Sequence, residues 1–183
     1  MTDAATLIED LTRPWRHGEH FDGRDIVVDE PLILDGLQVR GFDFSRACFK
    51  GGFSARGTVF RGLAWMRGAT VLGRCEFEGA HFRTDFRADG LRADAVVLDA
   101  CHLEGVLSFA DAHLGSLSVQ RGLVLANLTL QNAVIERDLN LSQTEIMGGL
   151  WTEGARFDAL VGEGAEISGR IRLSAQAQKG WPG

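Results

Sequence analysis

The sequence predicts an all-β protein, a single-stranded right-handed parallel β-helix of about 7–9 coils with a short N-terminal helix. Large apolar residues recur every five or six positions, and a small residue often stands two positions before them. This spacing fits neither an amphipathic helix, whose period is 3.6, nor a flat strand, whose period is two. No proline occurs between positions 32 and 181, so every residue there keeps the N–H that a long sheet requires.

The first 13 residues predict a short helix. Thr6 and Glu9 have the spacing of a capping box, and Pro14 would end the helix. Its apolar face would consist of Leu7, Ile8 and Leu11. We expect this face to cover one end of the β-helix.

The rest of the chain divides by composition. Residues 14–25 are expected to be a loop, so that residues 1–25 form a capping segment. The aliphatic run "IVVDEPLIL" opens the repeat domain, 26–175, and residues 176–183 form a C-terminal tail.

The repeat is followed by stepping 6, 5 and 5 residues from Leu103. Thirteen of the fourteen positions from Leu103 to Leu173 are large and apolar. They are Leu103, Phe109, Leu114, Val119, Leu125, Leu130, Ile135, Leu141, Ile146, Trp151, Phe157, Ile167 and Leu173, with Gly162 as the exception. Upstream, the rhythm gives Ile33, Val39, Phe44, Phe49, Ala55, Phe60, Trp65, Val71, Phe77, Phe82, Ala93 and Leu98. Arg87 interrupts it, and the adjacent Phe86 is expected to turn inward instead.

Residues at i−2 and i lie on the same side of an extended segment, so each segment offers one small and one large inward group. Cys75 and Cys101 occupy small positions, which predicts core packing and not disulfide formation or metal binding. The third cysteine, Cys48, leaves an odd number with no CxxC spacing. This cysteine usage fits a reducing cytoplasm.

Five segments, "CEFEG", "CHLEG", "AHFRT", "AHLGS" and "TEIMG", resemble the unit of the pentapeptide-repeat family. The resemblance covers roughly residues 37–175. It implies a four-sided right-handed β-helix and a bacterial protein. Two features depart from the family pattern: Asp or Asn at i−1 is nearly absent, and an extra residue enters at every third step.

That extra residue leaves the number of sides open. The 6, 5, 5 rhythm repeats every sixteen residues and favours three sides, with Leu103, Val119 and Ile135 in one column. A three-sided coil is similar to the bactofilins, which polymerise end to end, and "LEGVLSFADAHLGSLSV" looks like their sequences. A four-sided coil of about 21 residues would instead stack Ala80 on Cys101.

Chemistry-bearing motifs are missing from the sequence. It contains no HExxH, P-loop, GxSxG or CxxC pattern, so we expect no enzyme activity and assign no catalytic, cofactor-binding or metal-binding residues. The net charge of −6 argues against direct nucleic-acid binding. No stretch has the length and apolarity of a transmembrane segment or signal peptide, and we expect a cytoplasmic protein.

The polar positions of the repeat are expected to face water. His81, His102 and His113 each precede an inward residue, and only a four-sided coil would bring His81 and His102 together, close enough to share a metal. The central acids Asp85, Asp89, Asp94, Asp99 and Asp111 alternate with Arg83, Arg87 and Arg92. This pattern predicts an ion-paired surface and not an active site.

These features favour a structural scaffold or protein-interaction module that self-associates through an end into a homo-oligomer. The C-terminal tail offers only Trp181 as a large apolar group, so that end is expected to be poorly covered. One alternative is a bactofilin-like polymer-forming cytoskeletal protein. Another is an acidic DNA mimic that binds a topoisomerase, as the resemblance to some pentapeptide-repeat proteins implies.

Overall fold

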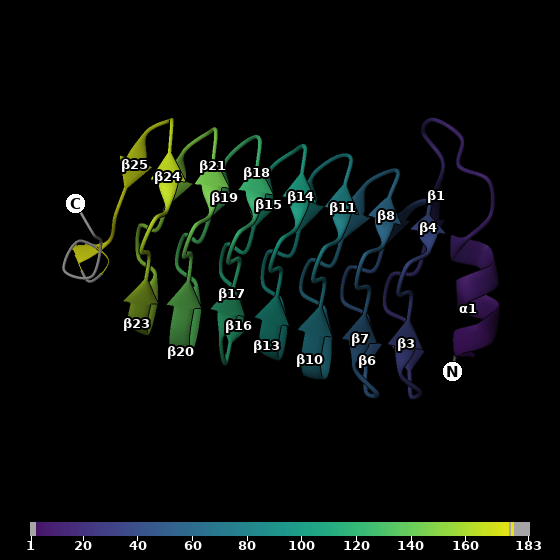
Figure 1. Ribbon diagram of the computed structural model, residues 1–183. Coiled ribbons are helices and arrows are strands. Elements are labelled where there is room, and N and C mark those ends of the chain that lie inside the picture. Colours follow the sequence, from purple (N-terminus) through teal and green to yellow (C-terminus); the bar gives the residue numbers. More distant parts are fainter. Residues whose placement is uncertain (1–2, 176, 178–183) are drawn as a thin grey trace.

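The computed structural model describes residues 3–175 and residue 177, and these form a parallel β-solenoid of about seven turns. The helix α1 (Ala4–Leu11) lies at the N-terminal end of the solenoid, and the chain then winds toward the opposite end (Figure 1). The predicted β-helix with an N-terminal helix is therefore confirmed. The predicted C-terminal tail lies outside the described residues except for residue 177.

Each turn takes 21 or 22 residues. Phe42 pairs with Ala64, and Ala64 pairs with Phe86, which are steps of 22, whereas Phe86 pairs with Leu107, a step of 21. The sixteen-residue, three-sided coil that we favoured is therefore wrong. Leu103 is aligned with Val124 and not with Val119.

The described strands stack in four columns, which we call faces 1 to 4 in chain order, so the coil has four sides. Face 1 consists of β1 (His20–Asp22), β5 (Gly41–Asp43), β9 (Ala64–Trp65), β12 (Phe86–Arg87), β15 (Leu107–Ser108), β19 (Leu128–Thr129), β22 (Leu150–Trp151) and β25 (Ile171–Arg172). Face 4 consists of β4 (Gln38–Val39), β8 (Val59–Phe60), β11 (His81–Phe82), β14 (His102–Leu103), β18 (Leu123–Val124), β21 (Glu145–Ile146) and β24 (Glu166–Ile167).

Faces 2 and 3 belong to one continuous sheet. In some turns each face has its own strand: β2 (Val27–Val28), β6 (Cys48–Phe49) and β16 (His113–Leu114) on face 2, with β3 (Leu32–Ile33), β7 (Phe53–Ser54) and β17 (Leu117–Ser118) on face 3. In other turns one strand bends across both faces: β10 (Thr70–Glu76), β13 (Arg92–Val97), β20 (Val134–Asn140) and β23 (Arg156–Val161).

The core fills the inside of the coil with stacked side chains. The N-terminal half is aromatic, whereas aliphatic residues such as Leu130, Leu139 and Leu141 replace the rings further along. The fully buried phenylalanines are Phe42, Phe44, Phe49, Phe60, Phe77, Phe82, Phe86 and Phe109. Because each turn buries its apolar groups only against its neighbours, stability depends on continuous stacking.

The predicted stride identified most inward residues correctly. At four positions, however, the inward residue is the one next to the residue predicted. Ile33 and Leu125 are 53% and 44% exposed. Trp65 and Trp151 lie half-buried on face 1, where the guanidinium groups of Arg67 and Arg172 cover their rings at 4.2 and 4.6 Å. At each of the four positions, a flanking residue points inward.

The error has a geometric cause. Two buried residues, Phe60 and Met66, are six positions apart because the corner between faces 4 and 1 takes an additional residue. From Phe60 onward the rhythm is 6, 5, 5, 5, and a second step of six occurs in turns that also lengthen the corner between faces 2 and 3. A sixteen-residue stride places the step of six residues one face too early. Because neighbouring side chains of an extended segment point to opposite sides, a shift of one residue exchanges inward and outward positions. The expected inward turn of Phe86 is confirmed.

The two-residue corners place their second residue in the left-handed region. Between faces 1 and 2, these residues are Asp25, Arg46, Gly68, Gly90, Asp111, Asn132 and Gly154. Between faces 3 and 4, they are Gly36, Gly57, Gly79, Ala100, Arg121, Gln143 and Gly164. Glycine takes this conformation without steric cost, which explains why corners are rich in it.

Two details of the N-terminal segment differ from expectation. The N-cap of α1 is Asp3, whose carboxylate accepts a hydrogen bond from the Thr6 amide at 3.1 Å, so Thr6 lies within the helix and the expected capping box is wrong. The segment 14–25 contains β1, which pairs in parallel with β5, and is therefore not a simple loop.

Candidate interaction surfaces

The N-terminal end of the solenoid is covered by α1. Leu7 and Leu11 are fully buried, and Ile8 packs partly against the core. The Leu11 carbonyl also accepts a hydrogen bond from the Arg40 amide at 2.9 Å. The covering role predicted for this apolar face is confirmed.

The C-terminal end has a different character. Among residues 3–175 and 177, no strand stacks beyond β23, β24 or β25. Ile171 is aligned with Leu150, which is 1% exposed, yet Ile171 itself is 40% exposed. The position is an inward one, and no further described strand lies on it; of the segment that follows β25, Ala177 is fully buried against the core. Val161 is aligned with Asn140 on the outer side of face 3 and adds an apolar side chain, 43% exposed, beside this end.

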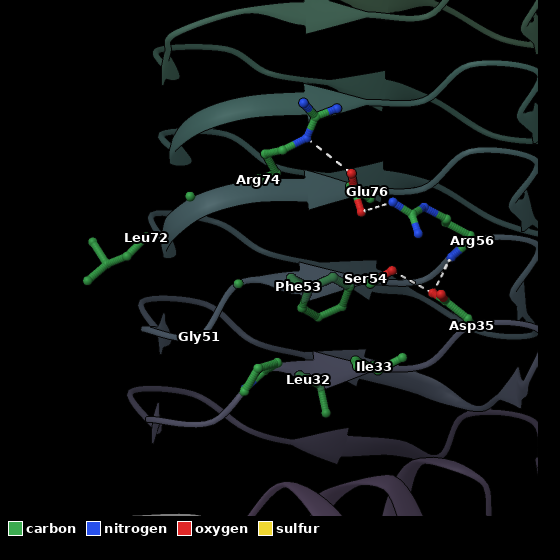
Figure 2. Close-up of a pocket in the computed structure, with 13 residues that line it drawn as sticks. Leu32, Ile33, Asp35, Gly51, Phe53, Ser54, Arg56, Leu72, Arg74 and Glu76 are labelled. Atoms are coloured by element: carbon green, nitrogen blue, oxygen red, sulfur yellow. Dashed lines mark hydrogen bonds and ion pairs between the residues drawn. The ribbon is translucent and has the colours of Figure 1, made fainter.

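A groove of about 420 Å³ lies on face 3, beside the corner with face 2. Figure 2 shows Leu72 projecting at its edge, and Ile33 and Leu72 are 53% and 54% exposed. Leu72 projects because the corner after Val71 has one residue more than the corner of the next turn, which shifts the register between β10 and β13. The groove therefore arises from the variable corner.

One wall of this groove carries hydrogen-bonded charges (Figure 2). The Asp35 carboxylate accepts hydrogen bonds from the Ser54 hydroxyl at 2.6 Å and from the Arg56 amide at 2.9 Å. Glu76 is paired with both Arg56 and Arg74. Apolar side chains next to oriented charges are chemistry suited to contact with another protein.

The acids in the middle of the solenoid mainly accept hydrogen bonds from the next turn, and fewer of them form ion pairs. Asp85 accepts a hydrogen bond from the Val106 amide at 2.8 Å, and Asp99 accepts one from the Gln120 amide at 3.1 Å. Asp111 accepts from the Asn132 side chain at 3.2 Å. The expected ion pairing is present between Asp85 and Arg87, at 2.9 Å. Such bonds hold the turns in register.

The histidines follow the four-sided arrangement. His81 and His102 are register partners on face 4, and their rings stack with centroids 4.7 Å apart. Glu104 lies beside them, with its Oε1 2.7 Å from Nε2 of His81. His113 lies on face 2, with Nε2 3.0 Å from Oε1 of Glu136. Sequence reasoning did not include Glu104 in this group, although its position two residues after His102 places it on the same side.

The cysteines Cys75 and Cys101 are buried, as expected, and Cys48 is half-buried. Burial raises the pKa of the Cys101 thiol to about 12, with a smaller contribution from the charge of Asp99. Burial likewise raises the pKa of the Cys75 thiol far above its ordinary value. Neither side chain is a ready thiolate nucleophile, because the thiolate is the reactive form.

No protein-family model matches this chain, and no curated protein matches it. Within the described part of the chain, no helix has the length and apolarity needed to cross a membrane. The β-solenoid fold is compatible with a structural or interaction module.

Proposed function

We propose that this chain is a non-enzymatic protein-interaction module whose rod associates with a second copy through the C-terminal end. The exposure of Ile171 carries the proposal. Leu128 and Leu150, its aligned neighbours in earlier turns, are almost completely buried. An unpaired sheet edge around a partly open apolar core favours association.

The charge distribution supports contact between identical ends. The last turn, residues 153–173, contains four acidic and three basic side chains. The seven are Glu153, Arg156, Asp158, Glu163, Glu166, Arg170 and Arg172. Because these charges nearly cancel, little electrostatic repulsion opposes contact between two identical ends. A twofold contact places the same surface on both copies and closes the assembly at two chains.

The test is a mass measurement in solution. Size-exclusion chromatography with light scattering at high micromolar concentration should give twice the chain mass of 19.9 kDa. Ile171→Glu and, separately, Val161→Glu should shift the mass toward that of one chain. A wild-type monomer at this concentration would refute the proposed self-association.

A matched control separates the end from a general effect of added charge. Leu72 is 54% exposed, but it lies on the side of the rod. Leu72→Glu should leave the dimer intact. If it dissociated the dimer while Ile171→Glu did not, the contact would lie along the groove on face 3 and not at the end. Circular dichroism melts of all three variants establish that each remains folded.

A bactofilin-like filament has weaker support. Its resemblance rested on a three-sided coil, which the 21- and 22-residue turns replace. The covering of the other end by Leu7 and Leu11 also opposes end-to-end growth. Extended filaments of the wild-type protein in electron micrographs would overturn this preference.

An acidic DNA mimic is also less favoured. Exposed acids are often neutralised by bases from the next turn, as in Asp25 with Arg46 and Asp29 with Lys50. The two Asp25–Arg46 hydrogen bonds lower the pKa of that carboxyl. Inhibition of gyrase supercoiling by micromolar protein would support mimicry, and no effect would oppose it.

We further propose that the chain is related to the pentapeptide-repeat proteins. The four strand columns and a turn of 21 or 22 residues support this, since the resemblance implies a four-sided coil. The absence of enzyme activity is likewise part of the proposal, and the raised thiol pKa values of Cys75 and Cys101 support it for cysteine chemistry.

A further inference from the structure

His81, His102 and Glu104 bring three potential metal ligands together on face 4. One ligand atom from each of these side chains lies within 4.8 Å of the others. The two imidazole rings stack with an interplanar angle of 23°, and the Glu104 carboxylate is 2.7 Å from Nε2 of His81. Imidazole nitrogen and carboxylate oxygen are the donor types that zinc accepts alongside thiolate.

We propose that these three side chains bind a zinc ion and leave its fourth coordination position open to water. Tetrahedral zinc at about 2.0–2.1 Å from each donor places neighbouring donors about 3.3 Å apart. The present donor separations, at most 4.8 Å, exceed this by about 1.5 Å at most. Side-chain rotation at the surface is sufficient to close that difference.

The backbone places the two histidines in advance. His81 and His102 are aligned partners in β11 and β14. The His102 amide donates to the Ala80 carbonyl at 2.9 Å, and the His81 amide donates to the Thr58 carbonyl at 2.8 Å. These bonds belong to the ladder that defines the solenoid. The site therefore does not require a loop to become ordered, and little conformational entropy opposes binding.

Another histidine–glutamate pair among the described residues serves as an internal comparison. His113 and Glu136 lie 3.0 Å apart, close to the separation of His81 and Glu104. The residues aligned with His113 are Arg92 and Val134, neither of which is a metal ligand at neutral pH. Arg92 and Arg137 also line the shallow groove around this pair, and their positive charges oppose a cation. Of these two described pairs, the one on face 4 has a second imidazole, that of His102.

Binding at face 4 would link two consecutive turns. Zinc bound to the folded chain but not to the unfolded chain raises the melting temperature in proportion to the logarithm of its concentration. The site lies in the middle of the solenoid, away from the last turn (Figure 1). A test of zinc binding therefore does not depend on whether the proposed self-association is correct.

The test uses full-length, tag-free protein stripped of metal, in a Cys48→Ser background so that this half-buried thiol does not bind zinc. Titration calorimetry with zinc chloride should give one ion per chain, and a molar excess of zinc should raise the melting temperature. His102→Gln and Glu104→Gln should each weaken binding by at least about tenfold. His113→Gln should bind as the parent does.

Two outcomes would overturn the proposal. One is the absence of both binding heat and a melting shift in the parent protein. The other is zinc affinity that His102→Gln leaves unchanged, which would place the ion elsewhere. Melting in the presence of chelator shows whether each variant is folded. If His102→Gln is unstable, cobalt substitution in the parent protein decides, because tetrahedral cobalt with imidazole ligands gives intense visible absorption and octahedral aqueous cobalt does not.

Discussion

Phe60 and Phe82 stack face to face in consecutive turns, with ring centroids 4.5 Å apart and planes inclined by 14°. They are aligned partners in β8 and β11, and both are almost completely buried. The contact shows how this core is built, because a side chain meets its counterpart one turn away in addition to inward residues of its own turn, such as Phe86, which stacks on Phe82 at 4.9 Å. Substitutions along one column should therefore have effects that depend on orientation more than on hydrophobicity.

Leu141→Asp should prevent cooperative folding. Leu141 is fully buried between stacked turns, and an unpaired carboxylate there costs several kcal/mol. Far-ultraviolet circular dichroism during heating is the measurement. A melting curve equal to that of the wild type would contradict the inward position of this residue.

Leu125→Asp is the matched control, because Leu125 belongs to the same apolar stride but is 44% exposed. The change in the free energy of unfolding should stay within about 0.5 kcal/mol, as for most surface substitutions. If Leu125→Asp destabilised the protein as much as Leu141→Asp, the register of β18 described above would be incorrect.

The energetic cost of the left-handed corner conformation can be measured with two substitutions, one that replaces glycine by alanine and one that replaces alanine by glycine. Gly57 has φ of +61°, and no heavy atom outside its chain neighbours lies within 4 Å of an added Cβ. Gly57→Ala should therefore cost about 1 kcal/mol through backbone strain alone. Ala100, with φ of +54°, occupies the equivalent corner, so Ala100→Gly should gain up to about 1 kcal/mol.

Urea unfolding of these two variants gives both free energies. The two changes should have opposite signs, and neither should alter the dependence of the unfolding free energy on urea concentration. Equal destabilisation by both substitutions would show that backbone conformation does not decide the corner residue.

Stability should fall in alkaline solution because of the buried thiols. The pKa of Cys101 is raised to about 12 from an ordinary value of 9.0, and that of Cys75 is also raised. The unfolded chain releases these protons above about pH 9, whereas the folded chain retains them, so the stabilisation present below pH 9 is lost as the pH rises toward 12.

Urea midpoints at pH 8 and pH 10 test this effect, with Cys101→Ala as the control. The substitution is expected to lower stability at both pH values because it leaves a cavity. The decisive quantity is the decrease in the urea midpoint from pH 8 to pH 10. This decrease should be smaller in Cys101→Ala than in the wild type. An unchanged difference would mean that other groups cause the alkaline loss.

Much of the core could be predicted without coordinates. The covering role of Leu7 and Leu11, the burial of Cys75 and Cys101, and the inward turn of Phe86 next to Arg87 all agree with the structure. Each of these follows from side-chain polarity and from alternation along an extended segment, which are local properties.

The number of sides could not be predicted in this way. A step of six residues is visible in the sequence, but the corner at which it falls depends on how the turns stack. Ile33 and Leu125 were consequently placed inward and are exposed. The meeting of His81, His102 and Glu104 depended on the same choice, because a sixteen-residue turn would have put the two histidines on different faces.

The spacing of apolar residues, five or six positions apart, was enough to predict a wound β-structure with a covered N-terminal end, because such a repeat buries its apolar groups by stacking turns. Tertiary structure decided the four sides, the open Ile171 and the paired histidines. The physical reason is that backbone pairing between turns selects the register, and the register brings together residues 21 or 22 positions apart.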